Sequence, residues 1–243
     1  MKNKVLTIVF IIFLILLILT VSIGVPIYCR FLYYIQIKTL HIEETSGYSY
    51  EIIKEAYDEV LNYLTLPNKP FGTGQLKYSE SGMSHFVDCK KLFNLNISVL
   101  LISLVSTVSL FILNKTNKIT FVNFKNKTPY FYSGVFGVLT PVILALLMAI
   151  NFDKAFTIFH KIFFPGKDNW VFDSRYDQII RILPQEFFRN CAIIVGITLL
   201  ILASSLVFIN YRITNKNIIT IQNKQCKRNI QKNNKPKKNR QTK

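Results

Sequence analysis

Histidines are the side chains of this 243-residue chain best suited to proton transfer near neutral pH, and there are three of them. His41, in the stretch TLHIEE, has no partner residue at a useful spacing, and we expect it to be an ordinary loop residue. His85 and His160 instead lie in polar segments that adjoin long apolar runs. Because an imidazole can act as a general acid or base, these two are the candidate catalytic residues.

His85 lies in the stretch SHFVDC, where Ser84 is predicted to be the N-cap of a helix. That cap would place His85 in the first helical turn, where the positive end of the helix favours an uncharged ring. Asp88, three residues further on, would share the face of His85 and orient its ring. Alternatively, Asp88 only neutralises the helix N-terminus while His85 faces water.

His160 lies in FHKIFFPGKDNWVFDS. It is on the flank of an aromatic stripe at helical spacing, formed by Phe152, Phe156, Phe159 and Phe163. We expect this stripe to prolong the preceding apolar helix and to end at Pro165-Gly166. Trp170, the only tryptophan, suits the aromatic belt of a membrane protein. His160 is either catalytic or a polar residue that reaches toward lipid headgroups. The stripe and Trp170 either line a groove for an acyl chain or anchor the protein at the membrane interface.

Long apolar segments dominate the chain, which is 50% hydrophobic, only 18% charged, and has a mean hydropathy of +0.29. A helix that crosses a bilayer needs about 20 apolar residues. Four stretches without any charged residue or histidine meet this requirement: 5–28, 95–113, 130–150 and 191–210. The first is interpreted as a retained helix, because it has no A-x-A cleavage site and exceeds a signal-peptide core in length. The sequence therefore predicts an all-α integral membrane protein with four transmembrane helices.

The charges predict the orientation of these helices. All 13 acidic residues fall in 29–94 and 151–190, which carry 13 basic residues as well. The other 17 basic residues precede the first span, separate the second from the third, or follow residue 210. Because Lys and Arg mark the cytoplasmic side, both termini are predicted inside and the two large loops outside. Residues 1–210 would form one membrane domain, followed by a disordered basic tail, 211–243, that lies against anionic headgroups and binds no nucleic acid.

Both outer loops are predicted to contain amphipathic helices. In SYEIIKEAYDEVLNYLTLP, apolar residues recur at helical spacing, namely Ile53, Tyr57, Val60, Leu61 and Leu64. A shorter helix is expected in the second loop, capped by Asp173 or Ser174 and followed by Pro184 in the first turn of the last span.

Several classes of site lack their sequence signature. The chain has no G-x-S-x-G, no H-E-x-x-H and no glycine-rich phosphate loop. Two histidines fall short of the three or four ligands of a zinc site, so no metal site is expected. The spans carry no ionisable residue, which argues against a transporter or proton pump. The cysteines at 29, 89, 191 and 226 have no metal-binding spacing and are interpreted as packing residues, with a disulfide between two of the first three as the alternative.

Two motifs, SHFVDCKKLF and FHKIFFPGKDNWVFDSRYDQIIRILPQEFF, resemble those of the bacterial lipoprotein intramolecular transacylases, a family of four-helix membrane proteins. The resemblance extends over nearly the whole chain, to about Asn210. In the family's form, Met-x-Asp-Val-Lys follows the first histidine. Here Phe86 and Cys89 replace the Met and Val, while Asp88 and Lys90 match.

The resemblance implies a reaction on lipoproteins anchored in the bacterial cytoplasmic membrane, at its outer leaflet. The sn-2 acyl chain of the diacylglyceryl group on the N-terminal cysteine would move to the cysteine's α-amine, giving a lyso-lipoprotein without any cofactor. His85 and His160 would be the catalytic pair, one taking the amine proton and the other protonating the departing glyceryl oxygen. Lys90 and backbone N–H groups of residues 84–87 are candidate oxyanion donors. Two other functions stay open: a non-enzymatic membrane scaffold or sensor whose outer loops bind a partner, and a two-histidine metal or haem protein.

Overall fold

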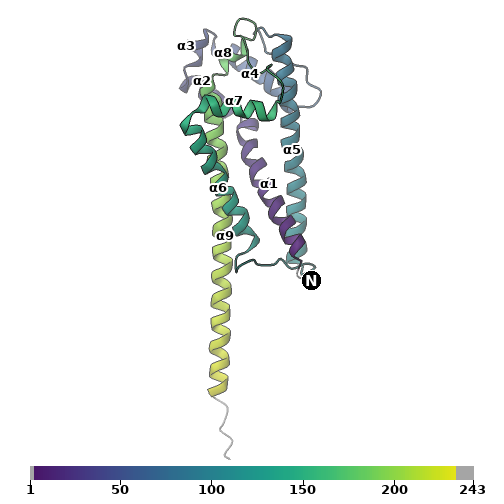
Figure 1. Ribbon diagram of the computed structural model, residues 1–243, viewed down its shortest axis with the longest axis vertical. Helices are drawn as coiled ribbons and strands as arrows, with labels where there is room; N and C mark the ends of the chain where they lie inside the picture. The colour runs from purple at the N-terminus through teal and green to yellow at the C-terminus, as the bar shows by residue number, and fades with distance from the viewer. Residues whose placement is uncertain (1–2, 234–243) are drawn as a thin grey trace, which may run out of the picture.

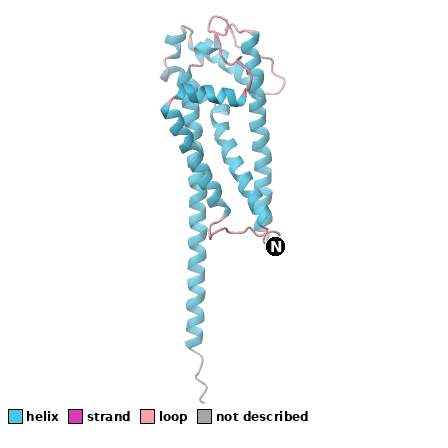
Figure 2. Ribbon diagram, in the orientation of Figure 1, coloured by secondary structure: helices cyan, strands magenta, loops and turns pink. Residues whose placement is uncertain are grey.

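The computed structural model describes residues 3–233, which form helices and loops without a regular strand (Figure 2). Four helices are long and apolar enough to cross a membrane: α1 (Lys4–Tyr28), α5 (Glu80–Lys115), α6 (Pro129–Ile150) and α9 (Gln185–Asn233). The predicted all-α fold with four candidate spans is confirmed. Each apolar run folds as a helix because only then are its backbone polar groups satisfied within lipid.

Five shorter helices gather at one end of the long ones and form a head (Figure 1). They are α2 (Phe31–Thr39), α3 (Ile42–Ser46), α4 (Tyr50–Thr65), α7 (Phe152–Phe163) and α8 (Ile179–Ile182). The head has its own apolar core, in which Tyr33 and Tyr57 stack with ring centroids 3.7 Å apart. Helix α4 coincides with the amphipathic helix predicted in the first loop, and its apolar face lies in this core.

The long helices pack most closely where small residues meet. On α6, Gly134 and Gly137 face Ala203 and Val207 of α9, and a Cβ atom at Gly134 would lie only 2.8 Å from the Ala203 carbonyl oxygen. Small residues permit this close approach of two backbones, which is how helices associate in lipid, where no hydrophobic effect drives them together. The large apolar side chains on the other faces, such as Leu146 and Ile201, are exposed and available to lipid.

Helix α5 begins earlier than predicted. Its N-cap is Ser79, whose hydroxyl accepts a hydrogen bond from the Gly82 N–H, so the prediction of Ser84 as the N-cap was wrong. With 36 residues, α5 is about 54 Å long, whereas the hydrocarbon core of a bilayer is about 30 Å thick. Only 95–113 is uncharged and apolar, so the charged turns that precede it, 80–94, project beyond the membrane-spanning segment.

Helix α7 does not prolong α6, contrary to the prediction. Asn151 separates the two with an extended backbone, and its side chain accepts a hydrogen bond of 2.8 Å from the Lys154 N–H. This side-chain cap starts a new helix, and Figure 1 shows α7 lying across the ends of the long helices. The aromatic stripe therefore lies along the base of the head rather than along a span.

The segment after the last span also differs from expectation. Helix α9 continues to Asn233 through most of the tail that was predicted to be disordered, and residues 234–243 lie outside the described part of the chain. A helix that is already nucleated by an apolar span extends at little further cost through residues such as Lys, Gln and Ile.

The α6–α9 contact can be tested with Gly134→Ala. Its added methyl group would collide with Ala203 and Val207, so we expect a loss of about 1–3 kcal/mol of stability and a lower Tm in detergent. Gly196→Ala is the matched control, because the nearest atom to its new Cβ is 3.9 Å away. Equal Tm values for the two variants would contradict the close contact.

Candidate active site

The fold brings His85 and His160 together from two elements that are 75 residues apart in sequence. His85 lies in the projecting part of α5 and His160 near the end of α7, and their ring centroids are 5.8 Å apart. Both side chains are buried, with exposed fractions of 6% and 7%. The α5 projection and the separate, crosswise α7 are thus what allows the rings to meet.

Aromatic side chains enclose the two rings. Trp170 stacks on His160 at 4.6 Å, and Phe156 lies 4.3 Å from the same ring. Phe164 contacts both histidines, with centroid distances of 4.9 Å to His85 and 5.7 Å to His160. Of the residues expected to contact substrate, Trp170 is therefore at the site. Phe164 was missed, because in the run Phe163-Phe164 nothing marks which ring turns inward.

Phe159 and Phe163 lie on the outer side of α7. Their exposed fractions are 47% and 48%, and their rings contact each other at 4.7 Å. The Phe159 ring also lies 5.4 Å from the His160 ring and forms the outer edge of the enclosure, whereas Phe163 contacts Phe159. This position suits contact with an acyl chain as well as it suits anchoring in the interface.

Hydrogen bonds define which ring nitrogens are free. His160 Nδ1 lies 2.8 Å from the Phe156 carbonyl oxygen. Since a carbonyl only accepts, Nδ1 carries the hydrogen and Nε2 holds the lone pair in the uncharged ring. His85 Nε2 lies 3.3 Å from Cys89 Sγ, and His85 Nδ1 is buried without a hydrogen-bond partner. Each ring thus keeps one uncommitted nitrogen.

Burial keeps both imidazoles uncharged at neutral pH. It lowers the pKa of His85 to about 4, and the neighbouring His160 adds to this shift. Burial also lowers the pKa of His160. The helix terminus is not the cause, because α5 starts at Glu80 and the effect of the dipole fades after the first turn.

Asp88 binds the loop after α7 rather than the His85 ring. Its carboxylate accepts hydrogen bonds from Lys91, at 2.9 Å, and from Lys167, and it lies 3.4 Å from the Asn169 amide nitrogen. The hydrogen bond from Lys167 is the main reason that the pKa of Asp88 is lowered to about 2. The expected orienting bond to His85 is absent from the described contacts, so Asp88 acts on the site through the loop.

The expected oxyanion donors find no support in this geometry. The Lys90 ammonium lies 4.2 Å from the centre of the Tyr63 ring, so it contacts a residue of the head. Residues 84–87 lie beyond the first four residues of α5, so their N–H groups are used in helical hydrogen bonds.

Of the other candidate groups, His41 lies apart from the pair, whereas one cysteine, Cys89, contacts His85. His41 is exposed and contacts Glu44 at 3.2 Å. The four cysteines are free thiols, so the alternative of a disulfide is not realised. Within the described part of the chain, no three His, Cys, Asp or Glu side chains are grouped to hold a metal ion.

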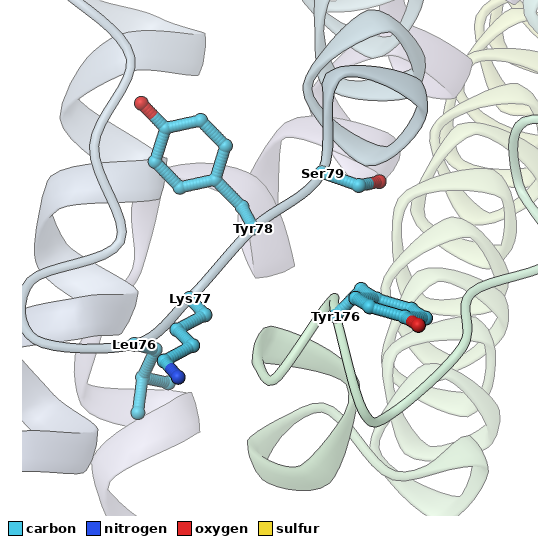
Figure 3. A pocket seen from close by; sticks show the side chains of 5 residues that line it. All are labelled: Leu76, Lys77, Tyr78, Ser79 and Tyr176. Carbon is cyan, nitrogen blue, oxygen red and sulfur yellow. The ribbon is translucent and has the colours of Figure 1, made fainter.

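A shallow depression lies beside the start of α5, lined by Leu76, Lys77, Tyr78, Ser79 and Tyr176 (Figure 3). Its volume is about 400 Å³, and neither histidine lines it. The Ser79 N–H and hydroxyl donate to the Asp177 carboxylate at 2.8 and 2.9 Å. This contact fastens the start of α5 to the segment before α8, as the Asp88 contacts fasten it to the segment after α7.

The role of Asp88 predicts the effect of Asp88→Asn. Loss of the charge weakens the bonds to Lys91 and Lys167, so we expect about 1–3 kcal/mol less stability and faster hydrogen exchange in residues 165–172. Because the lowered pKa of Asp88 stabilises the fold fully above about pH 4 and less as the pH falls toward 2, the difference from wild type should shrink over this range.

Asp173→Asn is the control, because it removes a solvent-exposed contact with Arg175. If hydrogen exchange in residues 165–172 is unchanged in the Asp88 variant, Asp88 does not anchor this loop.

Comparisons with known proteins agree with this architecture. A family model described as "Lipoprotein intramolecular transacylase Lit" matches residues 8–188. The fold is similar to that of the membrane integral lipoprotein intramolecular transacylase Lit from Bacillus cereus, with a TM-score of 0.80 and 28% identity over 89% of this chain and 97% of that one. Structures of the B. cereus protein with the H85R and H85A mutations have TM-scores of 0.74 and 0.71, at 27% and 28% identity. They cover 89% and 87% of this chain and 93% and 94% of those chains.

A curated, uncharacterised protein of Aquifex aeolicus (strain VF5) is 26% identical over 126 residues, which are 51% of this chain. The match spans about half of that relative, 52% of its length. The family match, in contrast, extends over most of the present chain and includes both histidines. The chain therefore belongs to the lipoprotein intramolecular transacylase family, and it is a multi-pass membrane protein of the acyltransferase class.

Proposed function

We propose that this protein converts diacylglyceryl lipoproteins to the lyso form by moving the sn-2 acyl chain to the α-amine of the N-terminal cysteine, with His85 and His160 as the acid and base. The observation that carries the proposal is the meeting of two uncharged imidazoles, 5.8 Å apart, in a buried site. Membership of the family supports acyl transfer on a lipoprotein.

Proton transfer is the task that two histidines suit. A free α-amine has a pKa of about 7.7–8.0, so much of it enters as ammonium and must lose a proton before it can attack. One uncharged ring accepts this first proton. The second ring accepts another proton as the C–N bond forms, and the first ring then protonates the glyceryl oxygen as the C–O bond breaks. The products are an amide, a free glyceryl hydroxyl and one proton that is released to water.

Proximity supplies much of the remaining rate enhancement. The amine and the ester belong to one molecule, so a site that holds both avoids the entropy cost of a bimolecular encounter. The aromatic enclosure of Phe164 and Trp170 restricts water at the rings, which favours transfer over hydrolysis of the ester. We assign Phe159 and Phe163, exposed on the outer side of α7, to contact with the acyl chain.

The site is assigned to the outer leaflet of the cytoplasmic membrane. The charge distribution supports this orientation, since the segments that bear the head are electrically balanced while all excess basic residues lie elsewhere. In this arrangement the head faces outward, where lipoproteins are anchored, and the extended end of α9 faces the cytoplasm.

Replacement of either catalytic histidine should reduce activity by about 10²–10⁴-fold, because His85→Ala and His160→Ala each remove one proton carrier. The measurement is mass spectrometry of the N-terminal lipid of a reporter lipoprotein, in a host that lacks this activity. His41→Ala is the matched control, since the side chain of this exposed histidine hydrogen-bonds only to Glu44 in the described structure, and it should give wild-type product. Protein level and Tm must be comparable. An undiminished yield of lyso-lipoprotein from the double variant that lacks both histidines would exclude them as the catalytic pair.

The orientation can be tested with the native thiol Cys226, which is exposed near the end of α9. A variant that keeps only this cysteine should react with a membrane-impermeant maleimide after permeabilisation and not in intact cells. A cysteine introduced as Lys69→Cys in a cysteine-free background should show the opposite pattern, because Lys69 is exposed on the head. Labelling of Cys226 in intact cells would reverse the assigned orientation.

A further inference from the structure

Two unsatisfied polar atoms lie next to the catalytic pair. Across the described residues, only three buried side-chain nitrogen or oxygen atoms have no hydrogen-bond partner, and two of them are His85 Nδ1 and Asn169 Oδ1. The third, on Thr107, lies within a membrane span. Folded proteins leave few buried polar groups unpaired, so a pair of them in one place requires a reason.

The contacts of Asn169 fix the direction of its amide. Its Nδ2 lies 3.3 Å from Ser84 Oγ and 3.4 Å from an oxygen of Asp88. Because the Asp88 carboxylate only accepts hydrogen bonds, the reversed amide would set two acceptor oxygens against each other. The amide NH₂ therefore faces Asp88, and Oδ1 is left without a partner.

Asn169 also lies beside the His85 ring. Burial is the main cause of the lowered pKa of His85, and the Asn169 side chain opposes it by favouring the protonated ring, as a hydrogen-bond acceptor does. No hydrogen bond joins the two side chains in the described contacts, although one offers an acceptor and the other a ring nitrogen. Both atoms are thus available to a third group.

The chemistry of these atoms selects that group. His85 can accept a proton at Nδ1 only in the tautomer that carries its hydrogen on Nε2, next to Cys89 Sγ, and in that tautomer both free atoms are acceptors. A carbonyl oxygen cannot satisfy two acceptors, and a hydroxyl can satisfy only one. A water molecule or a primary amine can donate to both at once, and of these two only an amine is a reactant in acyl transfer to nitrogen. Within the proposed reaction, the amine of the N-terminal cysteine is such a group.

We propose that Asn169 Oδ1 and His85 Nδ1 together bind the substrate's α-amine, and that Asn169 positions the nucleophile by accepting one of its N–H bonds. This inference rests on the proposed function, and it assigns the role of base to one histidine and the role of acid to the other. His85 takes the proton that the amine loses as the C–N bond forms. His160, which has received the first ammonium proton on Nε2, gives it to the glyceryl oxygen as the C–O bond of the ester breaks.

The test compares two non-reactive lipopeptides that carry an ether at sn-2, one with the α-amine and one in which hydrogen replaces it. Inhibition constants are measured for the full-length wild-type protein and for Asn169→Ala. A hydrogen bond of this kind corresponds to about a 10-fold change in affinity. We expect Asn169→Ala to raise the inhibition constant of the amine ligand by about 10-fold and to leave that of the des-amino ligand unchanged.

Two further variants make the outcome decisive. Asp168→Ala changes an exposed neighbour on the same loop and should leave both inhibition constants unaltered. Asn169→Ser serves if the alanine variant does not fold. Equal weakening of both ligands would show that Asn169 only supports the loop, and no weakening would show that it does not meet the amine. Either result overturns the inference, whereas the proposed function fails separately if wild-type protein forms no lyso-lipoprotein.

Discussion

The carboxylate of Asp88 accepts hydrogen bonds from Lys91 on its own helix and from Lys167 on the loop that follows α7. That loop also holds Trp170, whose indole N–H donates to the Lys167 carbonyl and whose ring stacks on His160. One carboxylate on the helix of His85 thereby holds in place the loop that packs on His160. The distance between the two imidazoles depends on this contact more than on any direct bond between them, since none joins the rings.

The membrane explains why the site has to be assembled in this way. Charged and unpaired polar groups are costly in hydrocarbon, so the spans of this protein carry apolar side chains and leave little room for chemistry. Catalytic groups must then come from the parts of the chain that leave the lipid. Helix α5 supplies one histidine by projecting about 15 residues beyond its apolar segment, and Asn151 supplies the other by ending α6 and starting a helix in a new direction. Both features place a histidine outside the apolar segments, so that the two rings lie 5.8 Å apart.

The sequence was sufficient for the features that depend on local composition. Four uncharged apolar runs predicted the four candidate spans, and the periodicity of Ile53, Tyr57 and Leu61 predicted α4. The two histidines that the fold brings together were also singled out from the sequence and from the family resemblance, and their catalytic role stays a prediction. The errors occurred where a local signal competes with tertiary contacts. Ser84 looked like a helix cap, but Ser79 takes that place while its hydroxyl binds Asp177, 98 residues away. The inward turn of Phe164 and the buried amide of Asn169 depend on packing between distant segments, which no spacing rule records.

Trp170 is the only tryptophan of the chain, and its ring rests on His160. All indole fluorescence of the protein therefore originates at one point, in contact with an imidazole of the candidate site. Because the emission of an indole responds to its immediate surroundings, the enzyme contains its own optical probe of the site. Entry of a lipid, displacement of the loop or ionisation of the ring would each alter a signal to which no other residue contributes.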